Sequence, residues 1–115
     1  MARHELHLKL TLRLYSDDDQ RCFGPGIATL LERVVVHRSL RAAAASMGMA
    51  YSKAWRIVNE AEGQLSCKLI ERDGARGSTL TPAGERAIAV YEELRADVNN
   101  VIATKADALI ASIKE

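Results

Sequence analysis

Leucine occupies every second position from residue 6 to residue 14, and polar residues fill the positions between. A period of two is typical of a strand that buries one face. We therefore expect a β-strand over residues 5–15. After a polar turn, Arg21-Cys22-Phe23 is expected to return beside it as a short second strand. That strand should end at Gly24-Pro25-Gly26, because glycine and proline interrupt regular structure.

From residue 27 the apolar positions change to the three-and-four spacing of helices. This spacing predicts a first helix from Ile27 to about His37, a second that begins after the N-cap Ser39, and a third from about Tyr51. Gly48 fits the left-handed position after the second helix. Two short helices joined by a tight, glycine-containing turn are typical of a helix-turn-helix, although an ordinary helical hairpin would give the same pattern.

A small β-hairpin is predicted directly after the third helix. Its strands are expected at residues 68–72 and 78–80, around a glycine-bearing turn. Thr81 is a suitable N-cap and Pro82 a suitable first residue for a further helix. A hairpin in this position is the wing of a winged helix-turn-helix.

No helix breaker follows Gly84, so the last helix is expected to continue for about thirty residues, far beyond a small domain at ~1.5 Å per residue. Its apolar stripe needs a partner, and we expect the same helix of a second copy, with folding back onto its own domain as the alternative. The stripe consists of Tyr91, Leu94, Val98, Ile102, Ala106, Leu109 and Ile113.

The predicted fold class is therefore mainly α with small β (α+β). It combines a winged helix-turn-helix, an N-terminal β-strand or hairpin, and a long C-terminal helix. We assign residues 1–86 to the winged helix-turn-helix domain and residues 82–115 to a C-terminal dimerisation helix.

Composition narrows the functional classes. The 115 residues include no apolar run near the ~20 that cross a bilayer, and the charged start lacks a signal-peptide core, so a cytoplasmic protein without a membrane role is expected. Cys22 and Cys67 belong to no CxxC pair and are interpreted as free thiols. No nucleophile–base pair, metal-ligand spacing or phosphate loop occurs, so we expect neither an enzyme nor a cofactor or metal site.

The net charge of +1 conceals a strongly basic centre. Residues 33–59 contain five Lys and Arg residues and no acidic residue, whereas every other part of the chain is slightly negative. Such a segment is the electrostatic pattern expected beside a phosphate backbone. It favours DNA binding over a winged helix that only binds other proteins, which remains the alternative.

The third helix is expected to enter a major groove and read base edges near its start. Its apolar residues define an inner face, which leaves Ser52, Lys53, Arg56 and Asn59 outside. Arg56 suits guanine and Asn59 suits adenine, while Ser52 suits a base or a phosphate. Lys53 is expected to meet a phosphate.

The remaining candidate DNA contacts flank this face. Arg38 and Arg41 are expected to bind phosphates, and Ser39 lies at a helix N-terminus, which favours an anion. Wing arginines suit the minor groove or its phosphates, although one of them could instead pair with a nearby acid. Tyr51 and Trp55 lie at the boundary of the inner and outer faces, where packing and DNA contact are both open. The wing arginines are Arg72 and Arg76, with Arg72 the candidate for an ion pair.

Three stretches resemble the DNA-binding domains of LysR-type regulators: Ala43-Ala44, Leu69-Ile70-Glu71-Arg72 and Leu80-Thr81-Pro82-Ala83-Gly84. Phe23-Gly24-Pro25-Gly26 and the stretch from Gly48 to Trp55 also resemble ModE-type molybdate-responsive regulators. The resemblance covers about residues 5–86 and departs at Arg38, where glycine is common.

The resemblance implies a DNA-binding transcriptional regulator that binds promoter DNA as a homodimer. ModE-type sensors carry molybdate-binding domains after this part, and the residues that follow are too few for one. We therefore expect a stand-alone DNA-binding domain without a small-molecule effector, or alternatively a DNA-binding subunit that relies on a separate sensor protein.

Overall fold

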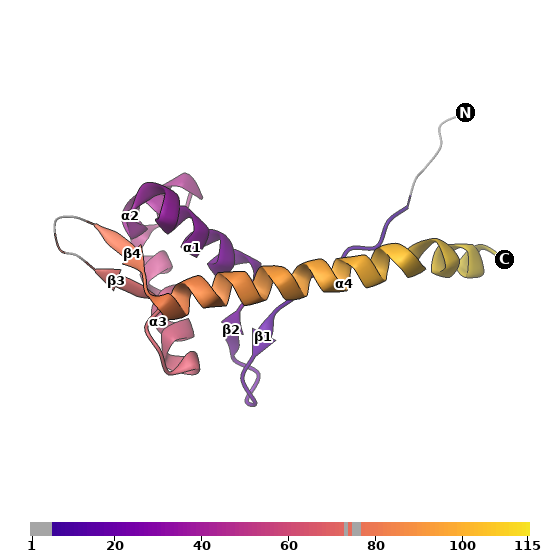
Figure 1. The fold of residues 1–115 in the computed structure, drawn as a ribbon, viewed down its shortest axis with the longest axis horizontal. Helices are drawn as coiled ribbons and strands as arrows, with labels where there is room; N and C mark the ends of the chain where they lie inside the picture. Colours follow the sequence, from indigo (N-terminus) through magenta and orange to yellow (C-terminus); the bar gives the residue numbers. More distant parts are fainter. Residues whose placement is uncertain (1–5, 73, 75–76) are drawn as a thin grey trace.

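A computed structural model of the chain describes residues 6–72, 74 and 77–115 (Figure 1). The predicted order of elements is confirmed. Two short strands come first, three helices follow, then two further strands, and finally one long helix. In chain order these are β1 (Leu14–Tyr15), β2 (Arg21–Phe23), α1 (Pro25–His37), α2 (Leu40–Ser46), α3 (Tyr51–Leu65), β3 (Ile70–Arg72), β4 (Ser78–Leu80) and α4 (Pro82–Lys114).

The core lies where α1, α2 and α3 meet, and it is built from small aliphatic side chains. Leu30, Leu31 and Val34 of α1 are fully buried there. Ala43 and Ala44 let α2 approach α1 and α3 closely, because a methyl side chain adds little thickness to a helix. Phe23 and Tyr91 close one side of the core with ring centroids 5.3 Å apart, so the first hairpin and the last helix both belong to it.

Local sequence explains where the helices begin and turn. Ser39 Oγ accepts a hydrogen bond from the Ala42 backbone N–H at 3.1 Å, which confirms the predicted N-cap of α2. Gly48 has φ +64°, the left-handed conformation expected between α2 and α3. Arg38 ends α1 in the same conformation, with φ +55°. Glycine adopts this conformation more easily than any other residue.

The prediction of one long N-terminal strand is wrong. Only Leu14–Tyr15 forms a strand, paired antiparallel with Arg21–Phe23, while residues 6–13 have no regular structure. Leu6, Leu8 and Leu10 are exposed. The reason is that β2 ends after three residues, where Gly24-Pro25 begins α1, so the earlier leucines have no neighbouring strand. Residue 5, the first of the predicted range, lies outside the described residues.

Residues 6–12 follow α4 instead. The Tyr91 hydroxyl donates a hydrogen bond to the Leu12 carbonyl oxygen at 2.8 Å, and Leu6 lies beside Ile110 and Ala111 near the other end of the helix. In Figure 1 this indigo segment and the outer part of α4 run in the same region of the molecule.

α4 confirms the predicted long helix. It spans 33 residues, begins at Pro82 after the N-cap Thr81, and extends far beyond the other elements (Figure 1). Tyr91 is its last buried residue; Leu94, Leu109 and Ile113 of the predicted stripe are exposed. Contact with the winged-helix core is thus limited to the start of the helix, while residues 6–12 lie beside its outer part. Among the described residues, no helix is both long and apolar enough to cross a membrane.

Cys22 and Cys67 are free thiols, as predicted. Cys22 is buried beside the core and Cys67 is exposed after α3. Burial raises the pKa of the Cys22 thiol, and a negative charge on Cys67 would raise it further.

Candidate nucleic-acid interface

The face of α3 that points away from the core carries the residues predicted to read bases. Ala54, Val58 and Ala61 are buried on the inner face. All four residues of the predicted outer face are exposed: Ser52, Lys53, Arg56 and Asn59. One exposed residue of this face, Glu60, was absent from the predicted set, because it lies just beyond the acid-free segment that ends at Asn59. The outer face is therefore basic and polar with an acid at its edge.

The wing-facing flank of α3 is a stack of aromatic and cationic side chains. The Arg41 guanidinium lies over the Tyr51 ring, 4.1 Å from its centroid, and the Arg72 guanidinium lies over the Trp55 ring at 3.6 Å. Arg72 Nη2 also donates a hydrogen bond to the Tyr51 hydroxyl at 2.8 Å. Four of the predicted site residues, from α2, α3 and β3, are thus brought into one cluster.

This cluster settles where Arg72 points. The sequence left open an ion pair with a nearby acid, but the two salt bridges found among the described residues, Glu62–Lys68 and Glu92–Arg95, do not include it. A guanidinium stacked on an indole ring keeps N–H groups at its edge free to donate. Arg72 therefore presents a cation with a fixed position beside α3.

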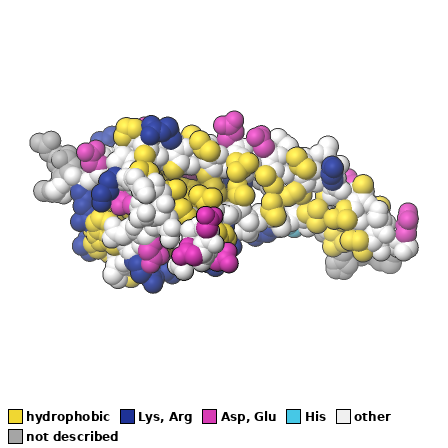
Figure 2. All heavy atoms as spheres, turned by 90° about the horizontal axis from the view of Figure 1, so that it is seen from below, with side chains coloured by type: hydrophobic (Ala, Val, Ile, Leu, Met, Phe, Trp, Pro, Cys, Tyr) yellow, Lys and Arg dark blue, Asp and Glu magenta, His cyan; other side chains and the backbone are white. Residues whose placement is uncertain are grey.

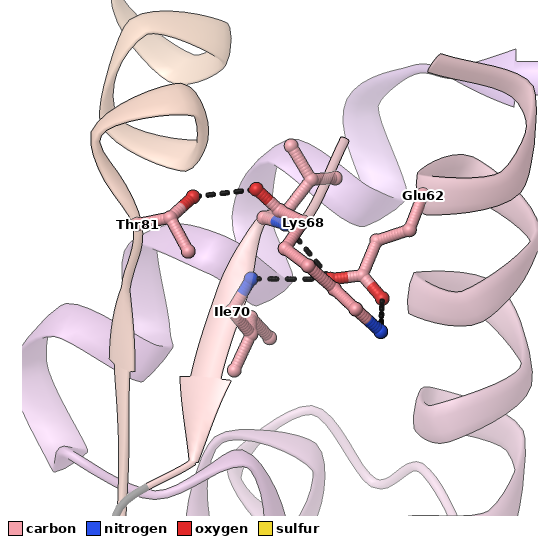
Figure 3. Close-up of polar contacts among 5 residues, drawn as sticks. Glu62, Lys68, Ile70 and Thr81 are labelled. Atoms are coloured by element: carbon pink, nitrogen blue, oxygen red, sulfur yellow. Dashed lines mark hydrogen bonds and ion pairs between the residues drawn. The ribbon is translucent and has the colours of Figure 1, made fainter. Parts of the chain in front are cut away.

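The carboxylate of Glu62 fixes the wing to α3 (Figure 3). It is buried, and it accepts hydrogen bonds from the backbone N–H groups of Leu69 at 2.8 Å and Ile70 at 3.3 Å. Lys68 Nζ lies 3.7 Å from the same carboxylate. Thr81 Oγ1 donates to the Lys68 carbonyl oxygen at 2.6 Å, which joins the start of α4 to the segment just before β3. The sequence reasoning missed Glu62, because a glutamate on a helix usually lies in solvent.

Two glycines allow these close contacts. A Cβ at Gly84 would lie 2.2 Å from the Leu69 carbonyl oxygen, so only glycine fits where α4 crosses the start of β3. A Cβ at Gly77, which has φ +103°, would lie 2.1 Å from the Arg38 carbonyl oxygen. That oxygen accepts a hydrogen bond from the Ser78 backbone N–H at 2.9 Å. The wing is thereby joined to the corner between α1 and α2.

The N-terminus of α2 lies beside this corner. Arg38 and Arg41 are exposed there, while Ser39 is half-buried and its Oγ already caps α2. Arg33, the first cation of the basic segment, contacts the end of α2 instead. Its Nη1 donates hydrogen bonds to the carbonyl oxygen of Ser46 at 2.9 Å and to the Ser46 Oγ at 3.0 Å. Arg33 thus supports the end of α2.

Charged and apolar side chains separate along the molecule. In Figure 2 most dark-blue Lys and Arg side chains gather on the winged-helix end, and yellow apolar side chains run along α4. Arg76, the second wing candidate, lies outside the described residues. In the described part of the chain, no group of three or more His, Cys, Asp or Glu residues could hold a metal ion.

Two basic residues beside α3 escaped the sequence analysis. Arg13 and Arg21 of the N-terminal segment line one hollow together with Lys53 and Arg56. No signal in the sequence could have found them, since they precede α3 by 30 positions or more and lie in a segment predicted mainly as strand.

Solved structures with the same fold are DNA complexes. The chain superposes on CbnR_DBD bound to DNA with a TM-score of 0.54 and 22% identity, over 76% of this chain and 95% of that one. It superposes on BenM_DBD in complex with catB site 1 DNA with a TM-score of 0.57 and 24% identity, over 78% and 94%. These likenesses confirm the winged-helix fold.

Curated relatives match by sequence. The DNA-binding transcriptional dual regulator ModE of Escherichia coli (strain K12) is 31% identical over 93 residues, which cover 77% of this chain and 33% of that protein. The molybdenum transport protein ModE of Herbaspirillum seropedicae is 35% identical over 92 residues, covering 76% and 31%. The chain thus spans about a third of the length of these relatives.

The family profile described as bacterial regulatory helix-turn-helix protein, lysR family, matches residues 28–85, from the end of the first turn of α1 to the first turn of α4. This range contains α2, α3 and the wing, the elements that carry the exposed basic face and the stacked arginines. The chain belongs to the lysR family of bacterial regulatory helix-turn-helix proteins.

Proposed function

We propose that this chain binds duplex DNA as a transcriptional regulator, with the outer face of α3 in the major groove. The observation that carries the proposal is the exposed set of Ser52, Lys53, Arg56 and Asn59 opposite the buried face of the same helix. An α-helix fits the major groove, and these side chains match the donors and acceptors of base edges and phosphates. The names of the curated relatives and the DNA-bound structural neighbours support the same function.

Within this face we assign base reading to Arg56 and Asn59, and phosphate contact to Lys53. The α2 side contributes Arg38, Arg41 and the helix N-terminus at Ser39. Arg72, held on Trp55 and Tyr51, reaches the backbone or minor groove beside the wing, and we assign the same role to Arg76. This division separates affinity from specificity, since phosphate contacts carry no base information.

Binding of Arg56→Ala to a set of duplexes tests this assignment. The duplexes come from a random pool selected by the wild-type protein, and each carries one substituted base pair. We expect preference at one position to relax by about 1–3 kcal/mol, because a bidentate arginine–guanine pair is lost. Arg86→Ala, on the exposed surface of α4, is the control. An equal loss on selected and unselected duplexes would contradict base reading by Arg56.

We further propose that two copies pair through α4, within residues 82–115, so that two winged-helix units of residues 1–86 bind two half-sites on promoter DNA. Leu94, Val101, Leu109 and Ile113 are exposed along the helix. Acidic and basic residues alternate beside them, as in Glu92–Arg95, so the surface can complement a second copy of itself.

Analytical ultracentrifugation of two matched double variants tests the dimer. Leu94→Glu with Leu109→Glu places two charges on the apolar stripe, and Ala96→Glu with Asn100→Glu places two charges on the opposite side of α4. We expect the first pair to sediment as a monomer with much weaker DNA binding, and the second pair to behave as the wild type. A wild-type protein that is monomeric throughout the micromolar range would overturn this part.

A further inference from the structure

A hollow of about 350 Å³ lies between the N-terminal hairpin, the start of α1 and one flank of α3. It is on the side of α3 opposite the stacked arginine cluster, because Lys53, Ile57 and Glu60 line it whereas Tyr51 and Trp55 do not. The hollow therefore borders the proposed base-reading face on its second edge.

Four cationic side chains face this hollow, and one carboxylate, that of Glu60, opposes them. Arg13 and Arg21 come from the N-terminal segment, and Lys53 and Arg56 come from α3. Neither salt bridge found among the described residues involves any of the four. Their positive charge is thus left without a close partner in the described part of the chain.

The start of α1 adds to this positive field. Gly24, its N-cap, has no side chain to accept a hydrogen bond, and the first turn contains no acidic residue. The partial positive charge of a helix N-terminus is therefore uncompensated here. Arg13 lies directly over this terminus, since a Cβ at Gly24 would be 3.1 Å from Arg13 Cγ.

We propose that this hollow holds a phosphodiester of the DNA backbone. The N-terminal hairpin then clamps one DNA strand, and the wing faces the other DNA strand. The inference rests on the proposed function. A helix about 10–12 Å wide nearly fills a major groove about 12 Å wide, so its two flanks lie against the two phosphate walls. One flank of α3 presents Arg41 and Arg72. The other presents this cationic hollow.

The test measures how binding of a selected 40-base-pair duplex depends on salt, using the full chain. Arg13→Gln with Arg21→Gln should make the slope of log K against log salt shallower by about 0.9, because the contact with one phosphate is lost. Affinity should fall to a similar extent on selected and unselected duplexes. Glu60→Gln should act in the opposite direction and tighten binding, because it removes the one negative charge at the hollow.

Lys105→Gln with Lys114→Gln is the matched control. It removes the same charge at the far end of α4 and should leave the slope unchanged. Circular dichroism of each variant is needed to check that it is folded. A wild-type protein that binds no DNA would overturn the proposed function as well. Salt-dependent wild-type binding with an unchanged slope in Arg13→Gln with Arg21→Gln would overturn only the clamp.

A comparison with inorganic phosphate distinguishes a free anion in the hollow from a phosphodiester of DNA. Wild-type protein and the double arginine variant are melted in phosphate and in chloride at equal ionic strength. If phosphate stabilises only the wild type while the DNA slope is unchanged by the double variant, the hollow holds a free anion and the clamp is refuted. A shallower slope with no difference between the salts supports the phosphodiester.

Discussion

The winged-helix part of the chain and the outer half of α4 contain similar apolar side chains but expose them very differently. Leu30, Leu31 and Val34 are 0% exposed, whereas Leu94, Val101 and Ile113 are 48%, 57% and 74% exposed. Both sets follow helical spacing. Periodicity therefore tells which face of a helix is to be covered, but it does not tell whether the cover comes from the same chain.

The largest expected contrast is between two leucine truncations. Leu30→Ala should lower the free energy of unfolding by about 2–5 kcal/mol, because it leaves a cavity in a closed core. Leu109→Ala should change it by less than about 0.5 kcal/mol in dilute protein, because that residue is on the surface, 47% exposed. Urea unfolding at low and high protein concentration measures both. Similar losses for the two variants in dilute protein would remove the distinction between the regions.

A second contrast compares two glycines in helices. Gly84→Ala should destabilise by about 1–3 kcal/mol, since its Cβ would meet the Leu69 carbonyl oxygen. Gly63→Ala, where a Cβ meets nothing within 4 Å, should instead stabilise by about 0.5–1 kcal/mol through better helix propensity. Thermal melting distinguishes the signs. A neutral Gly84→Ala would mean that α4 can shift away from β3, so the joint between the two regions is loose.

Arg38 tests whether a residue of the candidate DNA site destabilises the winged-helix part of the chain. Arg38→Gly should raise the free energy of unfolding by about 1 kcal/mol, because a side chain in the left-handed conformation is strained there. The same change should weaken DNA binding, because a cation is lost. Arg38→Lys is the control, and it should retain the wild-type stability. Greater stability together with unchanged DNA affinity would remove Arg38 from the interface.

Tyr91 marks the boundary between the two regions, and its removal has the smallest expected effect. Tyr91→Phe should cost about 0.5–1.5 kcal/mol, because the hydrogen bond to Leu12 is lost. Melting at pH 7 reports it. Leu12→Ala, which keeps the backbone carbonyl, should preserve that hydrogen bond.

Burial raises the pKa of the Tyr91 phenol above its ordinary value, so folding favours the neutral form. The resulting stability is present in full below about pH 10, the unfolded value, and is lost as the pH rises through the folded value. The difference in melting temperature between wild type and Tyr91→Phe should therefore be constant from pH 6 to 9 and shrink above pH 10. A constant difference at all pH values would show that the phenol is exposed.

Most of the fold could be predicted because its signals are local. Ser39 and Thr81 cap helices by contacts within three residues, and Gly48 turns the chain by its own φ. The outer face of α3 followed from helical spacing alone. The failed strand at residues 6–13 shows the limit, since alternating leucines need a neighbouring strand and the next segment turns into α1 after Phe23.

The parts of the candidate site that escaped prediction depend on distant contacts. Arg72 reaches Tyr51 across 21 positions, and Arg13 lines one hollow with Lys53 and Arg56 of α3, at least 40 positions later. Glu62 serves backbone N–H groups seven and eight positions later, which follows only from how the chain turns after α3. A short stretch of sequence does not predict these contacts, because only the folded path of the chain brings the partners together.

α4 runs for 33 residues without a break. At ~1.5 Å per residue it is a rod about 50 Å long, with the wing and α3 fastened to one end through Thr81 and Gly84. In a rigid helix of this length, a small tilt at one end causes a large displacement at the other. A tilt of about 5° at its far end would carry the attached wing and α3 through roughly 4 Å, comparable to one base-pair step of ~3.4 Å. In the proposed dimer, small changes in the angle between the two α4 helices would therefore change the separation of the two winged-helix units.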